Sequence, residues 1–347
     1  MGKYTVNCIA ATRPGLRQTQ LKSRMNDAKP AEQLIQSVPA QLAGQRLDQA
    51  LAQMFPEYSR SRLKEWILQG RVLVDGAARR PRDAVEKGEL VEITVVSDAA
   101  VVSLPESIDI EVVYEDDDLM IINKPAGLVV HPGAGNTRGT LMNGLLHLAP
   151  ELADLPRAGI VHRLDKETSG LLLVARTLTA HTALVRQLAA RQIKRRYLAV
   201  CAGVLTGGGT VDAPIGRHPV DRKRMTVRDD GRPAVTHYRV IERFASHTYI
   251  GVELDTGRTH QIRVHLAHRR HPLVGDATYG GRLALPAGAG AELTDTLRRF
   301  RRQALHAHSL SFLHPRTGLP VDVSVDPTAD FQQLLQVLRR SSAAGRR

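Results

Sequence analysis

Between residues 110 and 254 the chain falls into short apolar segments separated by turn-forming residues, and this pattern limits the fold more than any other feature. Residues 110–123 predict two strands around an acidic turn, and residues 171–176 predict a strand that lacks polar alternation and is therefore buried. Further strands are predicted at 196–202, 237–244 and 248–254. Because strands outnumber helices and follow one another as hairpins, we expect an α+β fold with a mixed, largely antiparallel sheet.

Helices are predicted where apolar residues recur every three or four positions. Residues 47–55 carry such a face, and Pro56 ends it. Ser59 is a good N-cap for a second helix, which Gly70 ends, and residues 71–76 then predict a strand that leads into an Asp-Gly turn. Two later helices are predicted at 179–191 and 259–267.

Histidine content separates a small N-terminal module from a larger one. The chain has 347 residues, which suggests two or three domains, and all 14 histidines lie from His131 onward. We expect a disordered basic arm over 1–43, a small module and linker over 44–105, a larger domain over 106–326 and a C-terminal tail over 327–347. Whether translation starts at Met1 or at Met25 stays open.

The composition excludes several classes of protein. The net charge of +13 indicates a polyanionic partner, and no apolar run approaches the roughly 18 residues of a membrane span. Cys8 and Cys201 are the only cysteines, so we expect no disulfide framework, no cysteine-based zinc site and a cytoplasmic location. The aromatic content of 4% disfavours binding of single-stranded nucleic acid by base stacking.

Three cations lie at the start of the second predicted helix: Arg60, Arg62 and Lys64. Each cation there opposes the helix dipole at a cost of about 0.3–1 kcal/mol, so helix stability does not explain them. A phosphate-binding face would explain them. A solvated charged face, neutralised in part by Glu57 and Glu65, explains them equally well on spacing alone.

The segment HRLDKETSG, from His162 to Gly170, has the densest set of reactive side chains. Its basic residues surround Asp165 and favour the ionised carboxylate. Asp165 is therefore a candidate nucleophile, a candidate general base or a partner in a loop ion pair, and spacing alone favours the ion pair.

A second cluster, TGRTHQIRVH, runs from Thr256 to His265. On the predicted helix, Thr259 and Arg263 share a face. We reject a zinc site here, because no cysteine is near, no H-E-x-x-H pattern occurs, and His260 and His265 do not share a helical face.

Two resemblances cover residues 44–326. The run RLDQALAQMF…SRSRLKEWILQGRVLVDG resembles the S4 RNA-binding module, with Asp75 where that family usually has Asn. Five further motifs, in order along the chain, resemble the RluA family of pseudouridine synthases. They are NKPAGLVVHPG, GIVHRLDKETSGLLLVAR, Arg196-Tyr197-Leu198, TGRTHQIRVHLAH and HPLVGDATYGG.

The resemblance implies that uridine is isomerised to pseudouridine in RNA without a cofactor or metal. It implies that Asp165 is the catalytic carboxylate, that Arg263 pairs with it, and that Tyr197 stacks on the uracil and is a candidate acceptor of the C5 proton. Arg163 matches the side chain that enters the duplex when the base leaves. Lys124 is either a fixed structural contact or a phosphate contact. In the S4 family the second helix and the strand-turn after it lie on structured RNA, and Arg60 and Arg62 are at the expected places. We therefore expect Arg60, Arg62 and the neighbouring Lys64 to bind RNA.

Within the family the likeness is greatest to a member that acts on 23S rRNA. We therefore expect uridines in one stem-loop of 23S rRNA, free or in a pre-50S particle, as the substrate of a monomeric enzyme. Transfer RNA, another rRNA site, an N-glycosylase and a non-catalytic ribosome-assembly factor stay open as alternatives. The resemblance does not decide whether the carboxylate attacks the sugar or forms a glycal.

Overall fold

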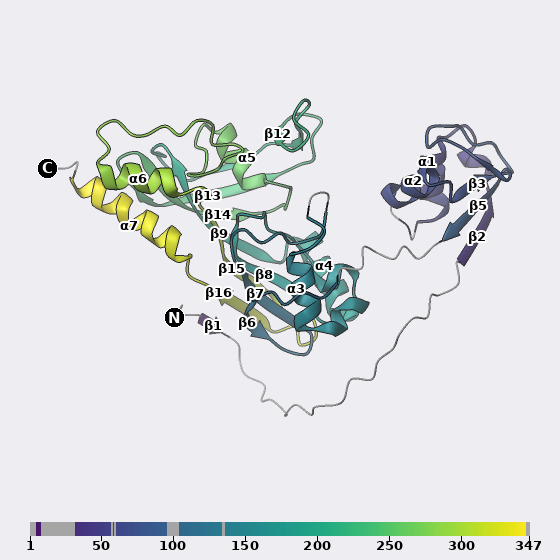
Figure 1. Ribbon diagram of the computed structural model, residues 1–347, viewed down its shortest axis with the longest axis horizontal. Helices are drawn as coiled ribbons and strands as arrows, with labels where there is room; N and C mark the ends of the chain where they lie inside the picture. The colour runs from purple at the N-terminus through teal and green to yellow at the C-terminus, as the bar shows by residue number, and fades with distance from the viewer. Residues whose placement is uncertain are drawn as a thin grey trace. The chain divides into compact units, whose positions relative to one another are not determined.

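The computed structural model divides into two compact units, Arg13–Val102 and a larger unit formed by Met1–Thr12 with Ser103–Arg347. Figure 1 shows the course of the chain through both units. The structure describes residues 5–7, 32–56, 58, 60–95, 104–133 and 136–344.

The small unit is a four-stranded sheet covered by two helices. Its helices are α1 (Leu47–Met54) and α2 (Arg60–Leu68), and η1 (Ala40–Leu42) precedes them. The sheet has the order β2-β5-β3-β4, formed by β2 (Glu32–Ser37), β5 (Leu90–Val95), β3 (Val72–Val74) and β4 (Ala77–Ala78). Leu63 and Trp66 are fully buried against the sheet. The two helices and the strand before the turn are confirmed, and Ser59 lies outside the described residues.

The prediction of a disordered arm over residues 1–43 is wrong for residues 32–43. Strand β2 pairs antiparallel with β5 along its whole length, and Leu42 is buried in the core of the small unit. Short β1 (Thr5–Asn7) pairs with a strand of the large unit. The remaining residues of the expected arm lie outside the described part. A short edge strand such as β2 takes its stability from its partner, so its own sequence gives little signal.

The large unit is built on one extended sheet with the order β10-β13-β14-β9-β15-β8-β7-β6 and with β16 and β1 beside β15. Its strands are β6 (Glu111–Glu115), β7 (Leu119–Lys124), β8 (Ser169–Ala175), β9 (Lys194–Ala202), β10 (Gly209–Asp212), β13 (Val235–Arg243), β14 (His247–Leu254), β15 (Leu305–Leu313) and β16 (Pro320–Ser324). Among the described pairs of strands, β8 and β15 alone run parallel. The expected mixed, largely antiparallel sheet is confirmed. A separate hairpin consists of β11 (Ile215–Arg217) and β12 (Met225–Val227).

Helices cover both faces of this sheet. They are α3 (Leu141–Leu148), η2 (Pro150–Asp154), η3 (Pro156–Gly159), α4 (Leu178–Ala189), α5 (Gln261–His268), α6 (Ala291–Arg299) and α7 (Ala329–Ala344). The predicted helices at 179–191 and 259–267 correspond to α4 and α5, with ends that differ by one or two residues. No helix in the described part of the chain is long and apolar enough to cross a membrane.

A glycine allows the close approach that brings the loop before β8 to the centre of the sheet. Gly170 has φ +109°, and a Cβ there would lie 2.2 Å from the carbonyl oxygen of Ala307. In the registers, Ala307 of β15 lies opposite Gly170 on one side and Tyr197 of β9 on the other. The loop with Asp165, which directly precedes β8, therefore ends beside the strand that carries Tyr197.

Within the segment expected as a C-terminal tail over 327–347, residues Ala329–Ala344 instead form α7. Its apolar face, with Phe331 and Leu334 fully buried, packs in one cluster with Val200 of β9 and with α6, which lies beside it in Figure 1. Apolar residues at 331, 334, 335, 337 and 338 have the spacing of an amphipathic helix, and this signal identifies the helix.

Replacing Phe331 with Ala is expected to lower the free energy of unfolding by about 3–5 kcal/mol, because a fully buried aromatic ring would leave a cavity. Gln333→Ala, on the exposed face of the same helix, is the control and should change it by less than about 0.5 kcal/mol. Urea unfolding followed by circular dichroism measures both variants. Equal stabilities would mean that α7 does not contribute to the core.

Candidate active site

Arg263 joins two carboxylates in the centre of the large unit. Its Nη1 donates to Oδ2 of Asp165 at 3.0 Å, while Nε and Nη2 donate to the two oxygens of Asp276 at 2.7 and 2.9 Å. The Asp276 side chain is 0% exposed and the Asp165 side chain 16%. The structure thus brings Asp165 and Arg263 together, and it adds Asp276, which the sequence analysis did not single out.

The electrostatics of this group keep Asp276 and Arg263 charged. Burial raises the pKa of Asp276, but the hydrogen bonds and positive charge of Arg263 outweigh burial and hold that pKa below its usual value. For Arg263, burial lowers the pKa, while Asp276 and then Asp165 raise it by more. Because the folded-state pKa of Asp276 is lowered, its contribution to stability is present above its unfolded pKa and is lost as the pH falls through the folded value.

A buried lysine fixes the short loop that carries Asp165 by hydrogen bonds to backbone carbonyl groups. Lys124 is 0% exposed, and its Nζ donates to the carbonyl oxygens of Pro125, Leu128 and Lys166 at 2.7, 2.9 and 3.0 Å. Burial, partly offset by the charges of Glu167 and Asp165, lowers the pKa of Lys124 to about 8. With all three donors in use, Lys124 has no free donor for a phosphate. The expectation of a phosphate contact is wrong, and the alternative of a fixed structural contact holds.

A buried polar network fixes the start of α5, from which Arg263 extends. The Gln261 amide oxygen accepts from the Thr256 hydroxyl at 2.8 Å and from the backbone N–H of Arg258 at 3.0 Å, and its nitrogen donates to Thr236 at 3.0 Å. His265 hydrogen-bonds Thr236 through Nδ1 and the carbonyl of Ala213 through Nε2, at 2.8 and 2.9 Å. Both ring nitrogens of His265 are therefore occupied by protein groups.

Tyr279 connects the site to the separate hairpin. Its hydroxyl accepts the N–H of Met225 in β12 at 2.9 Å and lies 2.8 Å from Nδ1 of His260. Its ring contacts the guanidinium groups of Arg263 and Arg224, at 5.0 and 5.4 Å from the ring centre. With its Nδ1 bonded in this way, His260 directs Nε2 toward Asp165 Oδ1, at 3.9 Å. The motif HPLVGDATYGG contains both Tyr279 and Asp276. This motif was the one sequence signal from which Asp276 could have been identified as a site residue.

Tyr197 and Arg163 differ in their exposure to solvent. Tyr197 is only 6% exposed, and burial together with the charge of Asp165 raises the pKa of its phenol, against a smaller opposing effect of Arg195. The phenol is therefore protonated at neutral pH. Arg163, two residues before Asp165, is exposed.

In the small unit, the predicted RNA-binding side chains are on the surface where they are described. The Arg60 side chain is 58% exposed, with Nη2 3.7 Å from Asp48 Oδ2, and Lys64 is exposed. Arg46 already binds Asp48 through two hydrogen bonds of 2.9 Å, so the charge of Arg60 is only weakly neutralised. The Arg62 side chain and Glu57 lie outside the described residues.

One cluster in the described part of the chain has the geometry of a metal site: Asp116, Asp118 and His314. His314 Nδ1 accepts the backbone N–H groups of Arg316 and Thr317, both at 3.2 Å, so its proton is on Nε2 and is donated to Asp116 at 2.9 Å. Arg316 also pairs with Asp118. These contacts form a closed ion-pair network rather than free metal ligands.

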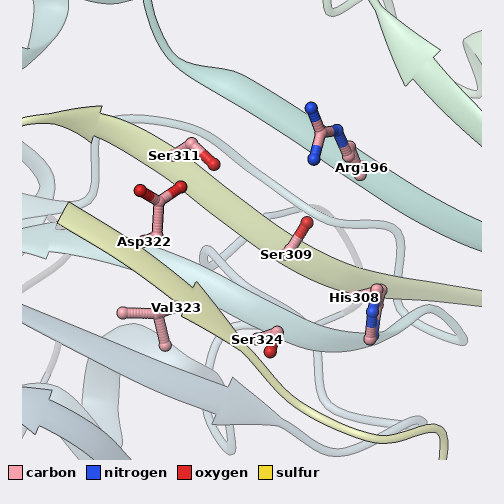
Figure 2. A pocket seen from close by; sticks show the side chains of 7 residues that line it. All are labelled: Arg196, His308, Ser309, Ser311, Asp322, Val323 and Ser324. Atoms are coloured by element: carbon pink, nitrogen blue, oxygen red, sulfur yellow. The ribbon is translucent and has the colours of Figure 1, made fainter. Parts of the chain in front are cut away.

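A polar cavity of about 270 Å³ lies elsewhere in the unit, along β9, β15 and β16 (Figure 2). Its lining residues are Arg196, His308, Ser309, Ser311, Asp322, Val323 and Ser324. Successive side chains of a strand point to opposite faces, so Arg196 and the neighbouring Tyr197 face different sides of β9. The cavity is therefore separate from the site around Asp165.

Comparison with known proteins assigns the class of this site. Residues 118–268 match the family described as RNA pseudouridylate synthase, and residues 45–91 match the S4 domain. The solved structure of Human RNA Pseudouridylate Synthase Domain Containing 4 is similar, with a TM-score of 0.53 and 26% identity over 66% of this chain and 93% of that one.

Curated relatives are much more similar. "Ribosomal large subunit pseudouridine synthase D" of Xanthomonas campestris pv. campestris is 58% identical over 88% of this chain and 92% of its own length. The proteins of the same name from Pseudomonas aeruginosa and Escherichia coli K12 are 55% and 54% identical, also over 88% of this chain and over 96% and 94% of their own lengths. The chain therefore belongs to the RNA pseudouridylate synthase family, and it is an RNA pseudouridine synthase with an S4 domain.

Asp276→Asn is expected to lower the rate of pseudouridine formation by roughly 10- to 100-fold, because an amide cannot accept both N–H groups of Arg263. Affinity for RNA should stay the same, since Asp276 is buried away from the surface. Release of tritium from RNA labelled at C5 of uridine measures the rate, and filter binding measures affinity.

The exposed Asp295→Asn is the matched control and should behave as wild type. Thermal unfolding followed by circular dichroism is used to choose an assay temperature at which both variants are folded. A normal rate in folded Asp276→Asn would contradict the role of Asp276 in positioning Arg263.

Proposed function

We propose that this chain converts specific uridines of the large-subunit ribosomal RNA into pseudouridine, with a stem-loop of 23S rRNA, free or in a pre-50S particle, as the substrate. The observation that carries this proposal is the Asp165–Arg263–Asp276 group in a chain 58% identical to a large-subunit synthase. The S4 domain and the net charge of +13 support an RNA substrate.

The proposed reaction rearranges bonds within one nucleotide. The N1–C1′ bond breaks, the uracil turns, a C5–C1′ bond forms, and the proton lost from C5 is balanced by one gained at N1. Since the product is an isomer of the substrate, the reaction needs no oxidant, reductant or donated group. We propose that the Asp165 carboxylate acts at the ribose, either by attack on C1′ or by removal of a sugar proton, and that it does so in the ionised form that Arg263 stabilises.

Two further roles are proposed for side chains around Asp165. The ring of Tyr197 provides a flat apolar surface on which the uracil stacks once it has left the RNA helix. Its raised phenol pKa supports stacking rather than service as a phenolate base. The exposed Arg163, on the same loop as Asp165, enters the space that the flipped base leaves.

All of these groups come from one chain, which supports action as a monomer. Cys201 is a buried free thiol, which supports a location in the reducing cytoplasm.

Replacing Asp165 with Asn is expected to abolish pseudouridine formation, because an amide of the same shape provides neither a nucleophile nor a base. Pseudouridine mapping of total RNA from cells with either protein measures this, with the exposed Asp109→Asn as control. Loss of pseudouridine from one 23S stem-loop is the expected result. Loss from transfer RNA or another rRNA site would contradict the proposed substrate, and no loss, together with no turnover of rRNA fragments by purified protein, would contradict the proposed catalysis.

Simultaneous replacement of Arg60, Arg62 and Lys64 by Ala is expected to weaken RNA binding and to make its salt dependence shallower. Each lost phosphate contact lowers the slope of log K against log salt by about 0.7–0.9. The control variant replaces Arg80, Arg82 and Lys87, three exposed cations of the same unit, and so has the same net charge. Equal slopes for the two variants would mean that the helix cations are only solvated surface charges.

A further inference from the structure

Adjacent arginines on β9 face opposite sides of the sheet. Arg196 points away from the candidate active site, and its Nε lies 3.3 Å from a carboxylate oxygen of Glu253. Arg195 is two residues from Tyr197 and therefore shares its face. Within the described residues, no carboxylate pairs with Arg195, and no protein group accepts a hydrogen bond from its buried Nε.

A second buried donor lies close to Arg195. His162 Nε2 accepts the backbone N–H of Leu173 at 3.1 Å, so the ring proton of the neutral imidazole is on Nδ1. Nδ1 is buried and makes no hydrogen bond of normal geometry among the described residues, although a weak interaction with the Arg163 backbone raises the pKa of the ring. Burial, together with the positive charge of Arg195, lowers the pKa of His162 to about 3, so the ring is neutral. Two buried N–H donors without a hydrogen bond of normal geometry thus lie near one another. His162 is three residues before Asp165, and Arg195 is two residues before Tyr197.

A missing side chain makes room for the Arg195 guanidinium. A Cβ on Gly257 would come within 2.8 Å of Arg195 Nη1. Gly257 belongs to the turn before α5, the helix that carries Arg263. The guanidinium therefore lies beside that turn, and its charge acts on both Tyr197 and His162.

The charges nearby do not neutralise Arg195. The carboxylate of Asp165 is bound by Arg263 at 3.0 Å, and Asp276 uses both oxygens on Arg263 as well. A partly buried guanidinium without a counter-ion is unfavourable, so this position is suited to an anion that arrives with the substrate. In RNA that anion is a phosphate, and the planar fork of Arg can bind two of its oxygens at once.

We propose that Arg195 binds a backbone phosphate next to the target uridine, with His162 Nδ1–H as a second donor to the same phosphate. The inference rests on the proposed function and adds a subsite to it. A phosphate held here, beside the ring on which the uracil stacks, fixes the ribose between Tyr197 and Asp165. Gly257 keeps the guanidinium in place by lacking a side chain.

The first test compares Arg195→Ala and Arg195→Lys with Arg196→Ala, a control on the other face of the same strand. Single-turnover rates are measured at saturating enzyme on a 23S rRNA fragment tritiated at C5 of uridine. Arg195→Ala should lose roughly 10- to 100-fold in rate, Arg195→Lys should keep part of it, and Arg196→Ala should match wild type. Gly257→Ala should resemble Arg195→Ala, because its methyl group displaces the guanidinium.

The second test removes the phosphate charge instead. After the modified uridine is mapped, a neutral methylphosphonate replaces the phosphate on its 5′ or its 3′ side. At one of these positions the substitution should slow wild type and Arg196→Ala but should slow Arg195→Ala no further. Additive losses at both positions, or equal rates for Arg195→Ala and Arg196→Ala, would overturn the inference. An inactive wild type would instead contradict the proposed function, so the two failures are distinguishable.

Discussion

The bridge from Arg263 to Asp165 and Asp276 organises the large unit. One guanidinium lies between two carboxylates, and Asp276 receives the two hydrogen bonds from Nε and Nη2 while Asp165 receives one from Nη1. This division leaves the second oxygen of Asp165 free of Arg263. The buried Asp276 fixes the orientation of the arginine, and the more exposed Asp165 stays accessible for the proposed role at the ribose.

Asp165 and Tyr197 come from elements that are far apart in sequence and are brought together by the sheet. Asp165 precedes β8, Tyr197 lies on β9, and β15 runs between these strands with Ala307 opposite both Gly170 and Tyr197. A side chain at Gly170 would collide with β15, so this glycine sets the spacing between the loop of Asp165 and Tyr197. Lys124 then holds the loop to the backbone that follows β7.

Local patterns predicted several of the elements, including β8, β9 and α5 around the site, because hydrophobic periodicity is a local property. The strands β6 to β9, β13 and β14 and the helices α1, α2, α4 and α5 were predicted in this way. The pairing of Asp165 with Arg263 spans 98 residues, and only the family resemblance indicated it. Asp276 and the burial of Lys124 were missed because both depend on contacts that no spacing reveals. A lysine is usually exposed, and only the three carbonyl groups around its Nζ make its burial possible.

Net charge indicates that the chain has an anionic partner, but position determines which cations are available to it. Lys194 and Arg196 both lie within 3.6 Å of Glu253, on the face of β9 away from Asp165. Arg195, between them in sequence, lies on the same face of β9 as Tyr197, and no group among the described residues accepts a hydrogen bond from its Nε. Three consecutive basic residues thus divide by strand alternation into two that stabilise the sheet surface and one that adds positive charge to the site. Counting charges along the sequence treats the three alike, and their pairing in the fold separates them.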